Sequence, residues 1–198
     1  MIDRRHPGQM REVKVRHLRP VAPALPAAAP TFEALFDQHA RYVWTTLRRL
    51  GARPTELEDL THDVFLQVFR HLADFDFERP VKPWLFGFAL RVASQDKRLA
   101  RRRPEVAHDM DDVSGAAPSA LEELLAEERR ALARAALDEI ELNRRAVFIL
   151  HELDGCTMPS IAEGLAIPLA TAYSRLRLAR ADFEKAARRL RARQRDHE

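Results

Sequence analysis

Glycine, cysteine and long apolar runs are all scarce in this 198-residue sequence. It holds only 6 glycines, and valine, isoleucine and threonine rarely cluster, which leaves little material for β-hairpins or glycine-rich phosphate loops. Cys156 is the single cysteine, so an internal disulfide and a cysteine metal cage are excluded, and a reducing, cytoplasmic setting is expected. No apolar stretch approaches the roughly 20 residues that cross a bilayer, so we expect neither membrane insertion nor export.

The abundant residues are those that favour helices. Alanine, leucine, arginine and glutamate dominate, while 46% of the residues are hydrophobic and 32% are charged. This balance is typical of a folded chain with a highly charged surface, not of a disordered chain. We predict an all-α protein with two small helical domains joined by an acidic flexible linker, the C-terminal domain being a helix-turn-helix.

The net charge of +3 conceals a segregation of charge along the chain. Residues 1–19 carry six Lys/Arg against two acids, and residues 91–103 carry six against one. Residues 105–128 carry eight acids and no Lys/Arg, whereas residues 170–195 carry nine Lys/Arg against two acids. Cationic modules on both sides of an acidic bridge suit a protein that binds nucleic-acid phosphates, although solvated helix faces are the plain alternative.

Prolines and acidic residues divide the chain into four parts. Residues 1–30 have prolines at 20, 23, 26 and 30, which oppose a helix, so we expect a disordered basic arm rich in proline and alanine. We expect an N-terminal helical domain over residues 31–103, an acidic linker over residues 104–128 and a C-terminal domain over residues 129–198. Helix is expected to resume around Leu121.

Three amphipathic helices are predicted in the N-terminal domain. The first begins at the N-cap Thr31 and ends at Gly51, and the second begins at a capping box formed by Thr55 and Glu58. The third follows the segment DFDFERPVKP and is closed by Pro104. Their apolar positions recur at helical spacing. These positions are Phe32, Leu35, Phe36, Val43, Leu47 and Leu50, then Leu57, Leu60, Val64, Val68 and Leu72, then Trp84, Leu85, Phe88, Val92 and Leu99.

The C-terminal domain has the spacing of a DNA-reading unit. The segments LEELLAEERRALARAALDEI and RRAVFILHEL each predict a helix, and Gly155 ends the second. Thr157 is a new N-cap with Pro159 in the first turn of a short helix that ends near Gly164. The tight connection LAIP and a long helix from Leu169 complete a helix-turn-helix pattern.

The long final helix is predicted to bury one side and expose the other. The residues expected to pack on the preceding helices are Ala172, Leu176, Ala179, Phe183 and Leu190. The residues expected to face away, or to flank that face, are Ala170, Thr171, Ser174, Arg175 and Arg177. Small side chains permit close approach to DNA and guanidinium groups bind phosphates or guanine edges, whereas a solvent-facing arginine-rich helix is the alternative.

The third helix offers a second basic surface. Its outward positions are Arg91, Ser94, Gln95, Arg98, Arg101 and Arg102. The preceding loop carries Arg79 and Lys82 and is bordered by the aromatic residues Phe75, Phe77, Trp84 and Phe86. Aromatic rings near cations suit an unstacked base, but Trp84 and at least one phenylalanine are better explained as core of a small domain.

The second helix presents a different surface. Asp59, Asp63 and Arg70 face outward together with Leu66 and Phe69, and exposed apolar groups in an acidic patch indicate a protein partner. The alternative is an ordinary amphipathic helix whose Leu66 meets a neighbouring helix.

Catalytic and metal-binding patterns are not found. HELDG from His151 lacks the second histidine of a zinc protease, and the pairs His62–Asp63 and His108–Asp109 have no further ligand at a suitable spacing. We therefore expect no enzyme activity, metal, cofactor or small-molecule substrate.

Three segments resemble bacterial RNA polymerase sigma factors of the extracytoplasmic-function (ECF) class. They are EDLTHDVFLQVFRHLADFD, PWLFGFALRVASQDKRLARRR and LNRRAVFILHELDGCTMPSIAEGLAIPLATAYSRLRLAR, and the resemblance covers residues 31–103 and 130–190. It implies that the N-terminal domain binds the polymerase clamp and captures the melted minus-ten promoter element. It implies that the C-terminal helix-turn-helix reads the minus-thirty-five element.

The resemblance assigns roles by position. The polymerase-binding positions are Asp59, Leu60, His62, Asp63, Val64, Phe65 and Leu66. The minus-ten positions are Arg79, Lys82, Trp84, Arg91, Ser94, Gln95, Arg98, Arg101 and Arg102. The minus-thirty-five positions are Ala170, Thr171, Tyr173, Ser174, Arg175, Arg177 and Arg180.

The chain departs from the family pattern at several of these positions. The usual Gln-Glu pair stands here as His62 and Asp63, and Arg91 and Gln95 stand where Asn and Asp are common. Tyr173 replaces a frequent Lys. The turn also has alanine at 166 where glycine is usual, and this residue needs a negative φ or some strain.

The sequence therefore predicts a dissociable, non-enzymatic initiation subunit whose partners are core RNA polymerase and promoter DNA, with an anti-sigma protein as a further candidate partner. A free-standing helix-turn-helix regulator would instead bind a duplex without polymerase, as a symmetric dimer. A helical adaptor would bind a protein through Leu66 and Phe69 and have only unspecific affinity for DNA.

Overall fold

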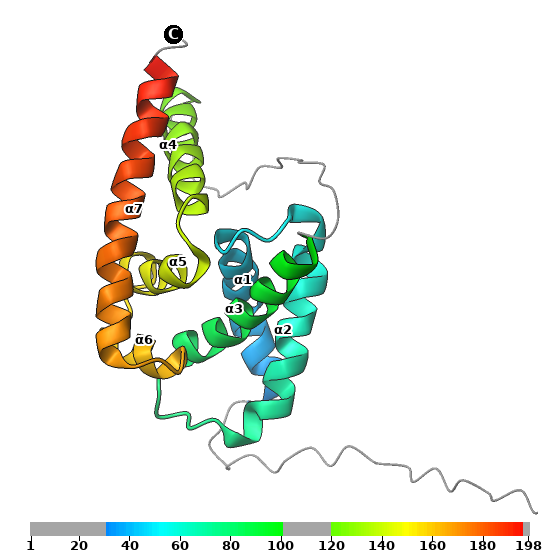
Figure 1. The fold of residues 1–198 in the computed structure, drawn as a ribbon. Helices are drawn as coiled ribbons and strands as arrows, with labels where there is room; N and C mark the ends of the chain where they lie inside the picture. The colour runs from blue at the N-terminus through cyan, green and yellow to red at the C-terminus, as the bar shows by residue number, and fades with distance from the viewer. Residues whose placement is uncertain (1–30, 101–119, 196–198) are drawn as a thin grey trace, which may run out of the picture.

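Helices account for the regular structure of residues 31–100 and 120–195, the part of the chain that the computed structural model describes (Figure 1). They are α1 (Phe32–Arg49), α2 (Leu57–His71), α3 (Val81–Ala100), α4 (Ala120–Asp138), α5 (Leu142–Phe148), α6 (Met158–Gly164) and α7 (Leu169–Arg195). Short 3-10 turns, Pro54–Glu56 and Leu72–Asp74, precede and follow α2, and a π-helical turn, Ile149–Leu153, extends α5. These residues contain no strand, which confirms the all-α class. None of their helices is both long and apolar enough to cross a membrane.

Helices α1 to α3 form the first module, residues 31–100. As predicted, Thr31 caps α1, its Oγ1 accepting a hydrogen bond of 3.2 Å from the Ala34 backbone N–H. The module encloses a core of fully buried side chains from all three helices. Its members include Val43, Leu47, Val64, Val68, Leu85 and Phe86. Each side chain of this kind contributes about 1.5–3 kcal/mol by leaving water, so the apolar stripes determine how the three helices pack.

The start of α2 differs from the prediction, because Thr55 and Glu58 do not form a capping box. Pro54–Glu56 is a 3-10 turn, and the N-cap of α2 is Glu56, whose side chain makes no capping hydrogen bond. The Glu56 carboxylate instead accepts a hydrogen bond of 2.9 Å from Arg53 Nε. A proline at the first position of the turn and a local ion pair thus replace the side-chain cap.

Two further boundaries refine the predicted ones. Helix α3 begins at Val81, ahead of Trp84, because the first helical turn tolerates a proline such as Pro83. Helix α4 begins at Ala120, as expected for helix resuming around Leu121, so it occupies the end of the segment assigned to the linker. The predicted arm and most of the predicted linker lie outside the described residues.

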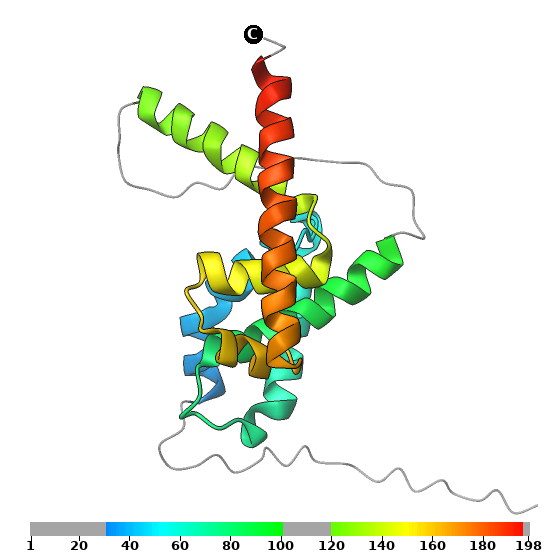
Figure 2. The ribbon, with the colours of Figure 1, turned by 60° about the vertical axis from the view of Figure 1, so that its left-hand side comes forward.

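Helices α4 to α7 form the second module, residues 120–195. The long helix α7 packs against α4, α5 and α6, and Figure 2 shows α5 and α6 crossing it along its first half. The predicted buried side of α7 is confirmed: Ala172, Leu176 and Ala179 are buried, and Phe183 and Leu190 are partly buried and packed on apolar clusters. Small residues on that side permit the close approach of the short helices.

Arg145 fixes the corner between α4 and α5. It is a buried charge, and its guanidinium donates to Asp138 Oδ1 at 2.7 Å, to the Asp138 carbonyl at 2.6 Å and to the Ile140 carbonyl at 3.1 Å. Burial lowers the pKa of Arg145, while Asp138 opposes that shift. The side chain thus satisfies carbonyl groups at the end of α4 that the helix itself leaves unpaired.

The turn between α6 and α7 is strained at Ala166. Its φ is 52°, in the left-handed region, whereas Gly51 and Gly155 occupy positive φ where glycine is favoured. The sequence required this alanine either to keep a negative φ or to accept strain, and the structure shows the second outcome. Alanine costs about 1–2 kcal/mol in this conformation.

The two modules pack directly against each other. Helix α3 contacts α6 and helix α1 contacts α4, and Figure 1 shows α5 and α6 lying beside the first module. A continuous apolar cluster joins Phe86 of α3 to Ile149 and Ile161 of the second module. The sequence predicted two domains but not this contact.

Candidate nucleic-acid and polymerase interfaces

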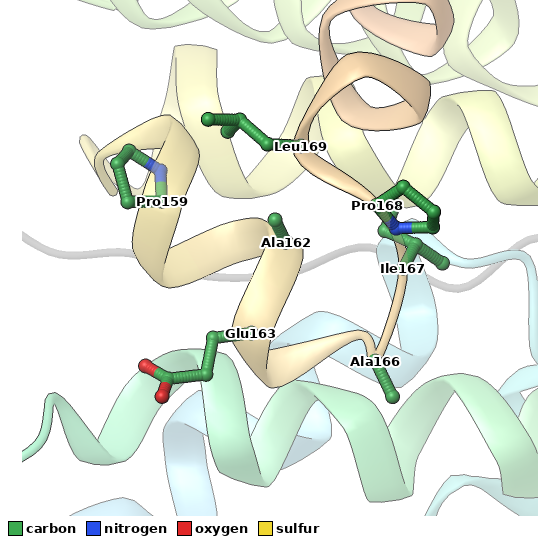
Figure 3. A pocket seen from close by; sticks show the side chains of 7 residues that line it. All are labelled: Pro159, Ala162, Glu163, Ala166, Ile167, Pro168 and Leu169. Carbon is green, nitrogen blue, oxygen red and sulfur yellow. The ribbon is translucent and has the colours of Figure 1, made fainter.

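The helix-turn-helix begins at the predicted cap. Thr157 Oγ1 accepts a hydrogen bond of 3.4 Å from the Ser160 backbone N–H, and Pro159 lies in the first turn of α6. A groove of about 610 Å³ opens between α6 and the start of α7 (Figure 3). Its lining residues are Pro159, Ala162, Glu163, Ala166, Ile167, Pro168 and Leu169. With one carboxylate among apolar and small side chains, this groove holds no set of groups for acid–base catalysis.

The outer face of α7 carries the residues predicted for the minus-thirty-five element. Ala170, Tyr173, Ser174, Arg177 and Arg180 are exposed, and Thr171 and Arg175 are half-buried. The face is therefore open to a large ligand, with small side chains next to cationic ones. Such a surface suits the major groove of a DNA duplex.

The arginines of this face differ in their surroundings. Arg180 is held by Glu152, with Nε donating to Oε1 at 2.7 Å and Nη2 lying 2.6 Å from the same oxygen. Arg175 and Arg177 have no ion-pair partner among the described residues. These two guanidinium groups are thus the ones directly available to an anion.

Helix α3 presents the second predicted basic surface. Arg91, Gln95 and Arg98 are exposed, and the Arg91 guanidinium lies 4.5 Å from the centroid of the Phe88 ring. Ser94 is half-buried and its Oγ donates to the Leu90 carbonyl at 2.6 Å. Arg101 and Arg102 lie outside the described residues.

The aromatic residues before α3 are packed together. The Phe75 and Trp84 rings stack with centroids 4.1 Å apart, and Phe77 meets Phe75 edge-on at 5.1 Å. Phe86 is fully buried and Phe75 nearly so, while Trp84 is partly buried. The core interpretation of these rings is correct in this structure, and Trp84 keeps one accessible part.

The cations of this loop are engaged as well. Arg79 forms an ion pair with Glu163 of α6, and the Lys82 ammonium lies 5.6 Å from the centroid of the Tyr42 ring. Both predicted minus-ten cations therefore have intramolecular partners in this arrangement.

Helix α2 exposes part of the predicted polymerase-binding set. Asp59, His62, Asp63 and Leu66 are exposed, Leu66 by 43%, so this leucine does not bury itself against a neighbouring helix. Leu60 is half-buried.

Val64 and Phe65 correct the prediction, because they are 0% and 2% exposed and point into the core. In a helix, positions this close in sequence to Asp63 and Leu66 lie on different faces, so Val64 and Phe65 hold the helix in place and do not contact a partner.

An aromatic cluster extends this surface in a way the sequence did not indicate. Phe36, predicted as core, is 38% exposed, and Phe69 is 41% exposed. The ring of Phe32 lies 5.2 Å from that of Phe69 edge-on, and Phe36 meets Phe65 at 4.7 Å. The available signal was the spacing of Phe32 and Phe36, which places two rings on one side of a helix start.

Acidic, histidine and cysteine side chains of the described residues form no group of three or more that could hold a metal ion. Cys156 is half-buried, and burial, reinforced by Asp154, raises the pKa of its thiol. A raised pKa lowers the thiolate fraction, so this cysteine is not an activated nucleophile.

Comparison with known proteins matches both modules to one family. Residues 35–103 match the model of sigma-70 region 2, and residues 130–183 match that of sigma-70 region 4. The ECF RNA polymerase sigma factor SigL of Mycobacterium tuberculosis is 31% identical over 160 residues, which cover 80% of this chain and 90% of SigL. SigK of Mycolicibacterium vanbaalenii is 33% identical over 153 residues, covering 75% of this chain and 78% of SigK.

Solved structures share the fold. The sigma factor RpoE of Bartonella quintana, in complex with the anti-sigma factor NepR, aligns with a TM-score of 0.62 at 16% identity, covering 79% of this chain and 96% of that one. CnrH in complex with the cytosolic domain of CnrY aligns with a TM-score of 0.55 at 23% identity, covering 78% of this chain and 85% of that one. With two sigma-region modules in the family order and relatives matched over most of their length, the chain belongs to the ECF RNA polymerase sigma factors, which direct transcription initiation.

Proposed function

We propose that this sigma factor divides its work among three surfaces: α2 for core polymerase, α3 for the minus-ten element and α7 for the minus-thirty-five element. The observation that carries the proposal is the placement of two outward basic helix faces and one acidic, apolar face on separate helices of one chain. The protein contributes binding energy and catalyses nothing, since the polymerase supplies the chemistry. It acts in the cytoplasm without a cofactor or metal.

The polymerase surface comprises Asp59, His62, Asp63 and Leu66, extended by Phe36 and Phe69. Acidic groups around exposed apolar side chains fit a basic, apolar helical segment of the polymerase. The exposed rings supply the apolar anchor, and the carboxylates orient it.

The upstream element is read by α7. Arg175 and Arg177, which have no ion-pair partner among the described residues, are the main candidates for contacts with phosphates or guanine edges. Ala170, Thr171 and Ser174 allow the helix to lie deep in the major groove, and Tyr173 contributes an exposed ring beside them.

The downstream element is bound along α3. Arg91, Gln95 and Arg98 supply exposed polar contacts, and the accessible part of Trp84 offers an aromatic surface for an unstacked base. Since Phe75 and Phe77 cover the rest of this aromatic group, base capture requires the loop between α2 and α3 to rearrange.

The remaining segments take the roles assigned by composition. Residues 104–128 act as an acidic connector that lies in a basic channel of the polymerase, and residues 1–30 as a basic arm. Replacing Asp109, Asp111 and Asp112 by asparagine is expected to weaken polymerase binding or alter early transcription, and unchanged behaviour in both assays would remove this role. The anti-sigma complexes of RpoE and CnrH support an anti-sigma protein as a partner here as well.

Polymerase binding tests the first surface. We expect Asp63→Arg to weaken the affinity for purified core polymerase at least tenfold, because it places a cation in the acidic patch, whereas Asp74→Arg, at an exposed position beyond α2, should leave the affinity within twofold. Circular dichroism spectra of both variants check that the helices remain. Equal effects of the two substitutions would reject α2 as the polymerase surface.

A further inference from the structure

The modules meet where two glycines leave no room for a side chain. A Cβ atom built on Gly87 of α3 would lie 2.6 Å from the Gly164 carbonyl oxygen of α6. A Cβ atom built on Gly164 would lie 2.6 Å from Pro83 Cβ and 2.7 Å from the Pro83 carbonyl. The backbone of the minus-ten helix and that of the first helix of the helix-turn-helix are therefore in direct contact, and only glycine fits at either position.

A buried carboxylate joins the modules at a second point. Asp154 follows the π-helical turn of the second module, and its side chain is 5% exposed. Its Oδ2 accepts a hydrogen bond of 2.8 Å from the Tyr42 hydroxyl, and its Oδ1 one of 3.2 Å from Arg49 Nη1. Both donors lie on α1 of the first module, so the groups that satisfy this carboxylate come from across the interface.

The donor state of Tyr42 is secure. Burial, reinforced by the Asp154 carboxylate, raises the pKa of the Tyr42 hydroxyl, which therefore stays protonated. A carboxylate withdrawn from water needs such partners, because hydrogen bonds must replace those to the solvent. Asp154 thus favours the closed arrangement as long as Tyr42 and Arg49 face it.

A third contact occupies a predicted DNA ligand. Arg79, assigned to the minus-ten element, forms an ion pair with Glu163 of α6. Both side chains are about half exposed, at 43% and 54%, so the pair adds little stability but places the arginine against the other module.

Promoter geometry conflicts with this arrangement. By their names, the minus-ten and minus-thirty-five elements are about 25 base pairs apart, which corresponds to about 85 Å along a duplex with a rise of 3.4 Å per base pair. Helices α3 and α6, one in each DNA-binding module, are in backbone contact. A chain in this state cannot hold both elements of one duplex at once.

We propose that the contact is self-inhibitory: the Gly87–Gly164 packing and the Asp154 latch, defined as Asp154 with Tyr42 and Arg49, hold the free chain closed, and the modules separate when polymerase and promoter bind. The inference rests on the proposed function for the consequence of opening, but the closure itself is a property of the free chain. Apparent affinity falls in proportion to the open fraction, so closure weakens binding that requires separated modules.

Gly87→Ala is the sharpest test because it acts as a wedge. Within α3, alanine is favoured over glycine, so the substitution supports the helix while its methyl group collides with the Gly164 carbonyl of the other module. We expect small-angle X-ray scattering of the full chain to show a larger radius of gyration than wild type, with unchanged helix content. We also expect at least fivefold tighter binding to core polymerase.

Tyr42→Phe tests the latch without adding volume, since it removes only the hydroxyl that donates to Asp154. The matched control is Tyr173→Phe, the same change in the other tyrosine of the chain, which lies 55% exposed on α7. Tyr42→Phe should expand the free chain and Tyr173→Phe should leave its scattering unchanged.

The outcomes separate the two proposals. If Gly87→Ala and Tyr42→Phe both keep their helices and scatter like wild type, the contacts do not hold the chain closed and the inference is wrong. If they expand the chain without a gain in polymerase affinity, closure is not inhibitory and the inference is equally wrong. If they expand the chain while wild type and variants all fail to bind core polymerase, closure stands and the proposed function fails.

Discussion

The two candidate DNA surfaces differ in how ready they are to bind. On α7 the outward residues are small or unpaired, and the face is open as it stands. Before α3, the rings of Phe75, Phe77 and Trp84 pack on one another, and Arg79 is held by the other module. Duplex DNA presents its edges in a groove, whereas a melted base must be inserted between side chains. A preformed surface suffices for the first task, and the second requires one that opens.

The strongest test of this contrast is the loss of an aromatic ring on each side. Trp84→Ala should lower the free energy of unfolding by about 2–4 kcal/mol, because it removes the stacking on Phe75 and leaves a gap in the first module. Tyr173→Ala, on the open face of α7, should change it by less than about 0.5 kcal/mol. Urea unfolding of both variants measures the difference. Equal losses would mean that the two surfaces are equally integrated into the core.

The second test addresses base recognition on α7. Arg175→Ala should cost about 1–3 kcal/mol of promoter binding if the guanidinium reads a base, and the loss should then vanish on a duplex mutated at that base. A loss of similar size on every sequence would assign Arg175 to a phosphate. Arg188→Ala, at an exposed position far along α7, is the control that should leave discrimination among upstream elements unchanged. Binding of holoenzyme to a panel of mutated upstream elements decides the role.

The third test concerns the turn that positions α7. Ala166→Gly should raise the free energy of unfolding by about 1 kcal/mol, because glycine adopts the observed φ of 52° without the alanine strain, partly offset by the entropy of the unfolded chain. Thermal or urea unfolding measures the gain. A destabilised variant would show that the alanine methyl group makes contacts that outweigh the strain.

The smallest effect is expected at Cys156. The pKa of its thiol is raised, so its thiolate fraction at pH 8 is lower than that of a free cysteine, and alkylation of the native chain should be several times slower than alkylation of the urea-unfolded chain. Raising the pH should increase the native rate over a range above the ordinary titration of a thiol. A native rate equal to or above the unfolded rate would instead favour a redox-sensing cysteine.

Local signals in the sequence were sufficient for most of the fold. Thr31 and Thr157 cap the helices they were predicted to cap, and the apolar spacing of α7 identified its buried side. The start of α2 was missed because the proline at its first turn and the Arg53–Glu56 pair compete with a capping box of ordinary appearance. Capping depends on which of several short-range contacts is made, and a sequence pattern does not rank them.

The functional surfaces were predicted by residue type more accurately than by orientation. Val64 and Phe65 fall in the family's polymerase-binding helix, but they point into the core, while Phe36 was expected inside and lies partly outside. The contact between modules was not predictable, because Gly87 and Gly164 are far apart in the sequence and a glycine inside a helix has no distinctive pattern. Only the three-dimensional arrangement shows that each glycine makes room for the other module.

One measurement tests the central claim most directly: transcription in vitro from a library of promoter fragments by purified core polymerase, with and without this protein, followed by sequencing of the transcripts. The account predicts discrete start sites that appear only with the protein and share two upstream elements, with Arg175→Ala altering the tolerance of the upstream element and not of the downstream one. Transcripts that are the same with and without the protein, together with no binding to core polymerase, would contradict it.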